Sequence, residues 1–243
     1  AGGKVAFRDV LARWPLPPSY VDEVHYGYTA LIYPARFADL DRDGKLDLIS
    51  VAVTKETYED TDGQEYPVWV VYIVTALGSG DGTFRERRTF APGQTPASHH
   101  GYEPVDIELC DVDGDGYLDA LEALQADWQG FIGVLLGDQS GGFRKAQVCD
   151  PFPQAAEMGY NSSGPCSIVP IDLDGDGDRD LVVGYGFGSG PPGLFSYLKN
   201  RGDGTFDDGL PVIIEPEPTI ETPEGRFTAV GDLNGDEALD ALL

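Results

Sequence analysis

Basic residues are scarce in this 243-residue chain, which has 16 lysines and arginines against 42 aspartates and glutamates and a formal net charge of −26. A surface with this much negative charge repels phosphate groups, so the composition excludes nucleic acid and anionic lipid as partners. Long hydrophobic runs are also missing. No apolar stretch reaches the roughly 18 residues that a membrane-spanning helix needs, which argues against membrane insertion.

Histidine and the common hydrolase motifs are scarce as well. The three histidines include an adjacent pair, His99 and His100, whose side chains point apart in an extended chain and so make a poor metal or catalytic site. The sequence contains no G-x-S-x-G nucleophile elbow and no H-E-x-x-H helix. We therefore expect that the protein is not an enzyme.

Cysteine occurs three times, an odd number. Cys149 and Cys166 flank a proline-rich connection, and a bond between them would stabilise the fold by about 3 kcal/mol in the chain-entropy model. An exported protein would favour that bond, so we predict a disulfide, with two unpaired thiols as the alternative. Cys110 stands beside Leu109 and is expected to be a buried free cysteine.

Aspartate, in contrast, is abundant and recurs in four stretches with the pattern D-x-[DN]-x-D-[GE]-x-x-D, which start 72, 61 and 60 residues apart. The pattern places side-chain oxygens at positions 1, 3, 5 and 9 of a tight loop and a backbone carbonyl at position 7. Calcium prefers six to eight oxygen ligands at about 2.3–2.6 Å. We therefore predict that three to four Ca²⁺ ions are bound. The predicted ligands are Asp39, Asp41, Asp43, Lys45 and Asp47; Asp111, Asp113, Asp115, Tyr117 and Asp119; Asp172, Asp174, Asp176, Asp178 and Asp180; and Asp232, Asn234, Asp236, Ala238 and Asp240.

The context of the loops separates them from the EF-hand, which needs a glutamate at position 12 and a helix on each side. Position 12 is glutamate only in the second loop, at Glu122. The segments 48–53 and 181–184, which follow the first and third loops, are short, β-branched and apolar, which indicates buried strands. The alternative is a set of acidic hairpin turns without metal, because Asp-Gly is a common turn former. The fourth loop departs most from the pattern, with Asn234 at position 3 and Glu237 in place of glycine.

A second element recurs between the acidic loops. Apolar segments at 68–74, 131–136 and 194–198 each precede a glycine-rich turn that ends in Phe84, Phe143 or Phe206. Asp-Gly or Gly-Gly between two strands predicts a hairpin, and the phenylalanine is expected to open the next strand facing the core. About four short strands in about 60 residues is the size of a propeller blade.

These repeats predict an all-β fold, a β-propeller of four-stranded blades with calcium loops, in one domain that spans residues 1–243. The chain holds material for about four blades. It could close a small ring or form a segment of a larger propeller. The expected units are a half-blade at 1–38, blades at 39–110, 111–171 and 172–231, and a half-blade at 232–243.

The pairing of D-x-D-x-D-G-x-x-D loops with G-D-G-T-F turns resembles the FG-GAP/VCBS repeats of integrin α-subunit-type β-propellers, over nearly the whole chain. The resemblance implies a propeller with its calcium loops on one face, and domains that mostly serve extracellular adhesion or recognition of a glycan or protein ligand. Propellers of this family usually have about seven blades, more than this chain holds.

On this basis we expect an extracellular or cell-surface calcium-binding module for adhesion or ligand recognition, in which calcium is mainly structural. One alternative is a structural repeat subunit of a surface filament or secreted assembly, with self-association through the half-blade ends. A less favoured alternative is a polysaccharide-acting enzyme on the same scaffold.

Two segments depart from the repeat and are candidates for binding. The first blade has about a dozen extra residues at 54–66, which form either a partner-binding loop or an acidic hairpin extension. The glycine-rich segment 184–193 carries Tyr185 and Phe187, which would suit stacking on a sugar ring or simply belong to a turn. Asn161 begins an N-x-S sequon.

Overall fold

A computed structural model describes residues 35–59, 63–90, 103–126, 129–153, 164–185, 194–213, 229–231 and 240–242. All fourteen elements in these ranges are strands, and every strand pairing is antiparallel. The predicted all-β class is therefore confirmed. The described part of the chain contains no helix long and apolar enough to cross a membrane.

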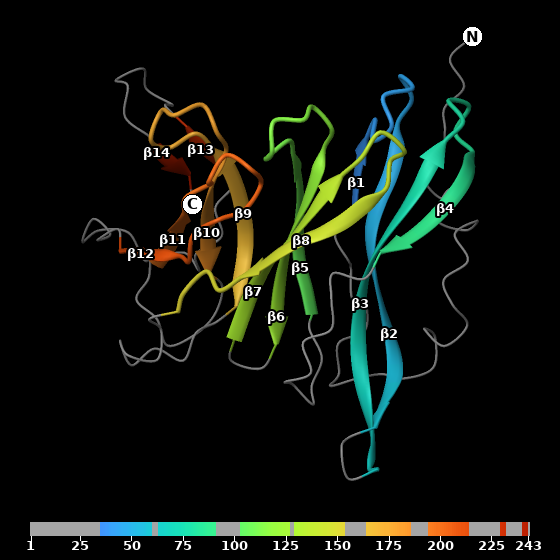
Figure 1. The fold of residues 1–243 in the computed structure, drawn as a ribbon, viewed down its shortest axis with the longest axis horizontal. Coiled ribbons are helices and arrows are strands. Elements are labelled where there is room, and N and C mark those ends of the chain that lie inside the picture. Colours follow the sequence, from blue (N-terminus) through green and yellow to red (C-terminus); the bar gives the residue numbers. More distant parts are fainter. Residues whose placement is uncertain are drawn as a thin grey trace.

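Three four-stranded sheets follow one another along the chain, and a two-stranded pair comes after them (Figure 1). Within each sheet the strands lie in sequence order. The first sheet comprises β1 (Ala35–Ala38), β2 (Asp47–Glu59), β3 (Glu65–Gly78) and β4 (Phe84–Phe90); the second β5 (Glu103–Cys110), β6 (Asp119–Ala126), β7 (Gln129–Gly137) and β8 (Phe143–Cys149); the third β9 (Pro165–Ile171), β10 (Asp180–Tyr185), β11 (Leu194–Leu198) and β12 (Leu210–Ile213); and the pair β13 (Ala229–Gly231) and β14 (Asp240–Leu242).

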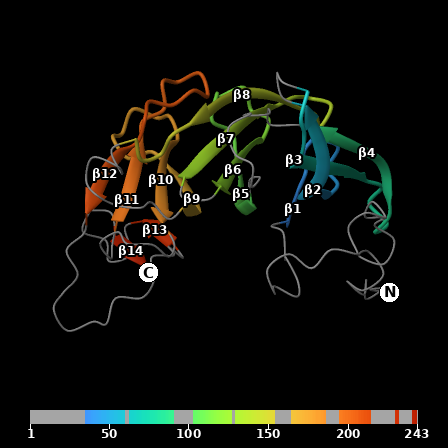
Figure 2. The same cartoon turned by 90° about the horizontal axis from the view of Figure 1, so that it is seen from below.

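The sheets stand side by side in an arc, which Figure 2 shows from below. Their first strands lie next to one another, since β5 contacts both β1 and β9, and β13 contacts β9. The last strands, β4, β8 and β12, lie on the outside of the arc (Figure 2). Each sheet has the strand count predicted for a blade, and the described strands form an arc.

Successive side chains of a strand point to opposite faces of its sheet. The second sheet is covered on both faces by its neighbours, so both of its faces are apolar. One core lies between the first and second sheets and includes Ile49, Ile73 and Leu135. Another lies between the second and third sheets and includes Leu121, Val134 and Leu181. Adjacent sheets are thus held together by face-to-face burial of β-branched and leucine side chains.

Each described acidic loop connects two neighbouring strands of the same sheet. Each joins the first strand of a sheet to the second, as in the pairing of Ala38 with Asp47 and of Cys110 with Asp119. A sheet therefore begins one strand before its acidic loop, whereas the sequence units 39–110, 111–171 and 172–231 begin at the loop. Each unit supplies three strands to one sheet and the first strand of the next.

The extra residues of the first repeat form a long two-stranded ribbon. Strands β2 and β3 pair as far as Glu59 with Glu65, but β1 reaches only Ser50 of β2 and β4 reaches only Ile73 of β3. The ribbon therefore projects well beyond the rest of the first sheet (Figure 1). This confirms a hairpin extension at 54–66, whose residues 60–62 lie outside the described ranges.

For Tyr185 the structure supports the structural alternative, whereas the prediction for Cys149 is wrong. Tyr185 was a candidate for sugar stacking, but it is buried, its hydroxyl lies 2.9 Å from the Ser196 hydroxyl, and its ring packs against Phe152. Cys149 is a free thiol with 1% exposure in the core between the second and third sheets, so the predicted disulfide with Cys166 is not formed. Burial raises the pKa of the Cys149 thiol to about 12. Cys110 is free, as predicted, and half-buried.

Candidate metal centre

The three described acidic loops have the same backbone shape. Position 6 is a glycine with a positive φ in each, 80° at Gly44, 89° at Gly116 and 97° at Gly177. Position 4 also lies in the left-handed region, with Arg42 there in the first loop. Glycine adopts this conformation without steric cost, which is why D-G-D-G sequences favour the tight turn. In the first two loops the turn brings the carboxylates of positions 1, 3 and 5 together.

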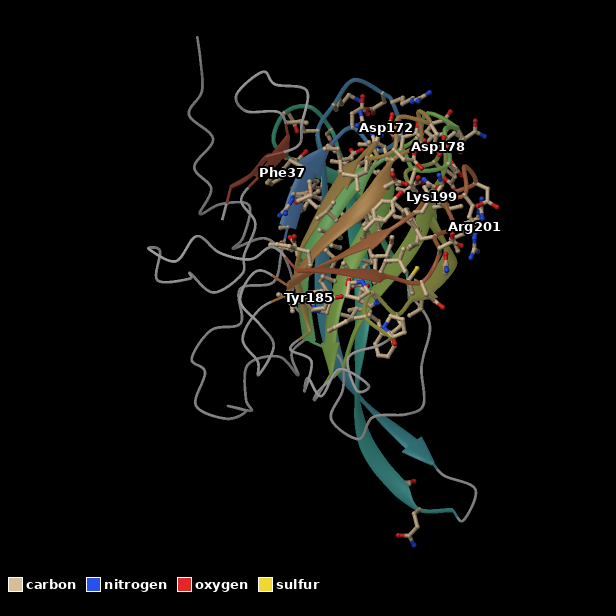
Figure 3. All side chains as sticks on the ribbon, turned by 90° about the vertical axis from the view of Figure 1, so that its left-hand side faces the viewer. Phe37, Asp172, Asp178, Tyr185, Lys199 and Arg201 are labelled. Atoms are coloured by element: carbon tan, nitrogen blue, oxygen red, sulfur yellow. The ribbon has the colours of Figure 1, made fainter. Side chains whose placement is uncertain are left out.

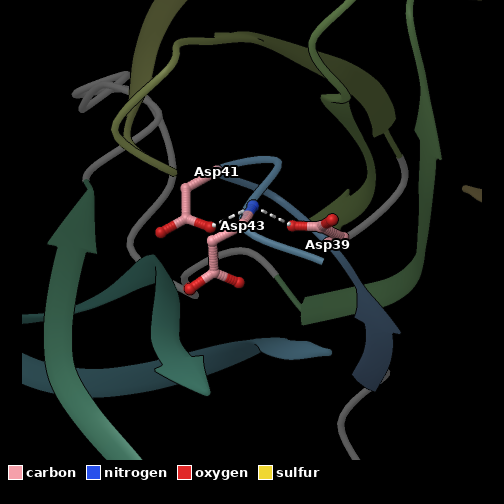
Figure 4. Close-up of side chains that lie close together, drawn as sticks. All are labelled: Asp39, Asp41 and Asp43. Carbon is pink, nitrogen blue, oxygen red and sulfur yellow. Dashed lines mark hydrogen bonds between the residues drawn. The ribbon is translucent and has the colours of Figure 1, made fainter. Parts of the chain in front are cut away.

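The carboxylates gather as the sequence predicted at positions 1, 3 and 5 of the first two loops. One oxygen from each of three residues lies within 4.8 Å of the others in Asp39, Asp41 and Asp43, and likewise in Asp111, Asp113 and Asp115. Figure 4 shows the first group, with the Asp43 backbone N–H donating to Asp39 and Asp41. The third group differs, because it contains Asp172, Asp174 and Asp180 in place of the position 5 residue.

Backbone N–H groups hold these carboxylates in place. In the first loop Asp39 accepts from Asp43 at 3.0 Å and from Gly44 at 2.8 Å. In the third loop Asp172 accepts from Gly175 at 2.8 Å and from Gly177 at 3.1 Å. Each carboxylate oxygen has two lone pairs, so an oxygen that accepts one hydrogen bond can still bind a cation.

The position 9 aspartates have a structural role that the sequence analysis missed. Asp47, Asp119 and Asp180 are completely buried, and both oxygens of each accept backbone N–H groups. In Asp119 one oxygen accepts from Val112 at 2.7 Å and the other from Gly137 at 2.7 Å. Burial raises the pKa of Asp119 to about 6, and the two N–H donors oppose that rise. These residues tie the start of the loop to the end of the third strand of the sheet.

Cationic side chains pair closely with carboxylates in the first and third loops. Arg85 lies 2.7 Å from oxygens of both Asp41 and Asp43, and Lys45 lies 2.8 Å from Asp43. The hydrogen bond from Lys45, with a further one from Arg85, lowers the pKa of Asp43. In the third loop Lys199 contacts Asp174 and lies 3.2 Å from Asp176.

The second loop is the least neutralised of the three. Among the described side chains its one ion pair joins Arg144 to Asp113 at 4.0 Å, and the arginine side chain is 68% exposed. The Oδ1 atom of Asp111 is buried and has no hydrogen-bond partner within the described ranges. A buried carboxylate oxygen without a partner is costly unless a cation satisfies it. The donor set is made of hard oxygens, which suits Ca²⁺ or Mg²⁺ rather than a softer metal.

The glycine-rich turn of each following sheet covers the loop before it. A Cβ at Gly141, in the turn of the second sheet, would lie 2.8 Å from the Leu77 side chain and 3.5 Å from that of Asp41. A Cβ at Gly204, in the turn of the third sheet, would lie 2.7 Å from Leu136 and 3.1 Å from Asp113. The contact therefore repeats along the array, and a side chain at the turn would have to displace the leucine of the preceding sheet.

Hydrogen bonds reinforce the contact between the second and third sheets. Asn200 is buried and donates through Nδ2 to the carbonyls of Val112 at 2.8 Å and Arg179 at 2.9 Å. Gln147 of β8 exchanges two hydrogen bonds with the backbone of Phe206. The second loop is thus packed against the third sheet as well as held within its own.

The first and second loops lie side by side, because the guanidinium of Arg42 lies 4.3 Å from the centre of the Tyr117 ring.

The remaining predicted ligands stay predictions. The carbonyls of Lys45, Tyr117 and Asp178 stay predicted ligands, and the backbone N–H groups of Lys45 and Tyr117 donate to the position 5 aspartate. Asp232, Asn234, Asp236 and Ala238 lie outside the described residues, and Asp240 begins β14.

Three antiparallel sheets that carry an acidic, oxygen-lined loop at the same place define a β-rich repeat protein with candidate cation sites. The model of a family described as FG-GAP-like repeat matches residues 39–122, 111–183 and 172–243. The chain belongs to the FG-GAP-like repeat family, which confirms the resemblance noted in the sequence. A search of curated proteins gives no match.

Proposed function

We propose that this protein is a calcium-binding β-propeller module of an extracellular or cell-surface protein that recognises a glycan or protein ligand, with calcium as a structural element. The observation that supports calcium most is the second loop, where three carboxylates converge and Asp111 Oδ1 is buried without a hydrogen-bond partner among the described residues. Membership of the FG-GAP-like repeat family supports the propeller and the recognition role.

The loops explain why the metal would stabilise the fold. Carboxylates within 4.8 Å repel one another, and a bound divalent cation would replace that repulsion with attraction. The unfolded chain does not assemble the loops, so the free energy of binding adds to the free energy of folding. The packing of Gly141 and Gly204 on the loops would extend this effect to the contacts between sheets.

Thermal unfolding in calcium and in excess chelator tests the proposal. We expect chelation to lower the melting temperature by about 10 °C or more, because several sites contribute. Magnesium at the same concentration serves as the control for a general ionic effect, and it should restore less of the stability than calcium. A melt that is the same in calcium and in chelator would contradict a structural role for calcium.

One observation favours the alternative of a self-associating repeat subunit. Gly141 and Gly204 are buried where their turns meet the preceding sheet, whereas Gly82, at the same place in the first sheet, is exposed. The first turn could therefore pack on an acidic loop of a second copy. Mass measurement in solution with calcium separates the two functions, since growth of open-ended oligomers with concentration supports the subunit and a constant monomer mass supports the module.

A further inference from the structure

The three loops differ in a side chain that lies just outside them. Gly78, Gly137 and Asn200 are equivalent, because the backbone N–H of each donates to the position 9 aspartate of its own sheet. The residue before each of them is therefore also equivalent. It is Leu77 in the first sheet and Leu136 in the second, both buried, but it is Lys199 in the third.

Lys199 turns toward the third loop. Its Nζ atom contacts Asp174 Oδ2 and lies 3.2 Å from Asp176 Oδ2. Figure 3 shows Lys199 at the same end of the third sheet as Asp172 and Asp178, well away from Tyr185. A lysine at this place thus brings a positive charge to two of the carboxylates that were predicted to bind calcium.

The contact coincides with a change in the carboxylate group. Position 5 belongs to the converging group in the first and second loops, as Asp43 and Asp115, but Asp176 does not belong to it in the third. Asp176 instead pairs with Lys199. In the second loop, by contrast, no cation lies closer than 4.0 Å to a carboxylate within the described residues, and Asp111 Oδ1 is unpaired.

From this difference we infer that Lys199 is an internal counter-ion that competes with calcium, so that the third loop binds the metal more weakly than the second. The inference rests on the proposed calcium binding. To bind a divalent cation, Asp174 and Asp176 must release the ammonium group, which then remains close to a second positive charge. The second loop needs no such exchange, and a cation there satisfies an oxygen that is otherwise unpaired.

The position 6 glycines provide a separate signal for each loop. The backbone N–H of Gly177 belongs to the third loop and that of Gly116 to the second, so their amide resonances report the two sites in one calcium titration of the full chain. We expect Gly116 to reach saturation at a lower calcium concentration than Gly177. The Lys199→Met variant keeps the aliphatic stem and removes the charge, and it should lower the midpoint for Gly177 about fivefold while leaving that for Gly116 unchanged.

Two variants serve as controls. Lys199→Arg keeps the charge and should behave as the original protein does. Lys55→Met removes one positive charge from the ribbon. Lys55 lies eight residues along β2 from Asp47, which is about 26 Å from Asp47 at the rise of an extended strand. This variant should move neither midpoint.

The outcomes separate this inference from the proposed function. An unchanged Gly177 midpoint in Lys199→Met, or saturation of Gly177 before Gly116, overturns the role of Lys199 while calcium binding stands. If neither glycine responds to calcium, the proposed calcium binding itself fails, and the inference fails with it.

Discussion

The Asp119 carboxylate and the Gly137 backbone N–H are joined by a hydrogen bond of 2.7 Å that spans 18 residues and fixes the acidic loop of the second sheet against its third strand. The same bond joins Asp47 to Gly78 in the first sheet and Asp180 to Asn200 in the third. The last aspartate of each of the three described loops is therefore part of the buried core.

Replacement of Asp119 by asparagine tests this structural role. One Asp119 oxygen would become an amide NH₂ group that faces a backbone N–H, so a buried donor would lose its acceptor. We expect Asp119→Asn to lower the free energy of unfolding by about 1–3 kcal/mol in urea titrations with excess chelator. Asp115→Asn, at an exposed position of the same loop, should change it by less than about 0.5 kcal/mol. Equal effects of the two variants in chelator would contradict the distinction.

Gly137 cannot accept a side chain. A Cβ there would lie 2.2 Å from the carbonyl oxygen of Leu118, which is backbone and cannot turn aside. We expect Gly137→Ala to destabilise the protein by about 2 kcal/mol or more, measured by urea unfolding. Gly175→Ala is the matched control, since nothing lies within 4 Å of a Cβ there and its φ of 79° alone should cost about 1 kcal/mol. A smaller loss at Gly137 than at Gly175 would show that the close approach relaxes.

Asn200 should control the coupling between the second loop and the third sheet. Asn200→Ala removes the Nδ2 donors to Val112 and Arg179 and leaves two carbonyls without those partners. We expect a loss of about 1–3 kcal/mol and faster amide hydrogen exchange in residues 111–119, with residues 39–47 unchanged. Asn200→Asp keeps an acceptor for the Gly202 N–H but not the donors, and it should lose as much. Faster exchange in the first loop as well would indicate general loosening.

Glu122 should make stability depend on pH. It is completely buried, neither oxygen has a hydrogen-bond partner within the described part of the chain, and burial raises its pKa from 4.5 to about 8. Between about pH 4.5 and about pH 8 the folded state binds more protons than the unfolded state. The free energy of unfolding therefore falls as pH rises, by about 1 kcal/mol per pH unit. Below about pH 4.5 this penalty vanishes, and above about pH 8 it is constant.

The Glu122→Gln variant removes the titrating group and keeps the shape. Urea unfolding in chelator at several pH values should show the variant gaining stability over the original protein as the pH rises from about 5 to about 8. The two proteins should converge in acid. A difference that stays constant across the interval would contradict a buried, titrating Glu122.

The sequence predicted the repeated parts of the fold well, because each rests on a local pattern. The apolar runs at 48–53, 68–74 and 131–136 lie within β2, β3 and β7, and Phe84 and Phe143 open β4 and β8 as expected. The convergence of positions 1, 3 and 5 in the first two loops follows from the D-x-D-x-D spacing and the turn, whereas in the third loop, with the same spacing, Asp180 takes the place of Asp176.

The parts that the sequence did not predict depend on contacts between distant residues. Lys199 reaches Asp174 across 25 residues, and Asp119 reaches Gly137 across 18, and neither pairing follows from the spacing within a motif. Glu122 was weighed only as an EF-hand ligand, but strand alternation places it on the apolar face with Ala120 and Leu124. That alternation was visible in the sequence, as was the lysine at the place of Leu77 and Leu136.

The offset between the sequence units and the sheets bears on how an array of this kind can change in length. Because each unit ends by giving the next sheet its first strand, recombination between equivalent aspartates such as Asp39, Asp111 and Asp172 would insert or delete one unit and still leave every first strand beside a second strand. Recombination between positions that are not equivalent would instead leave a sheet with a missing or an extra strand. The repeated topology is therefore compatible with gain or loss of whole units at the acidic loops.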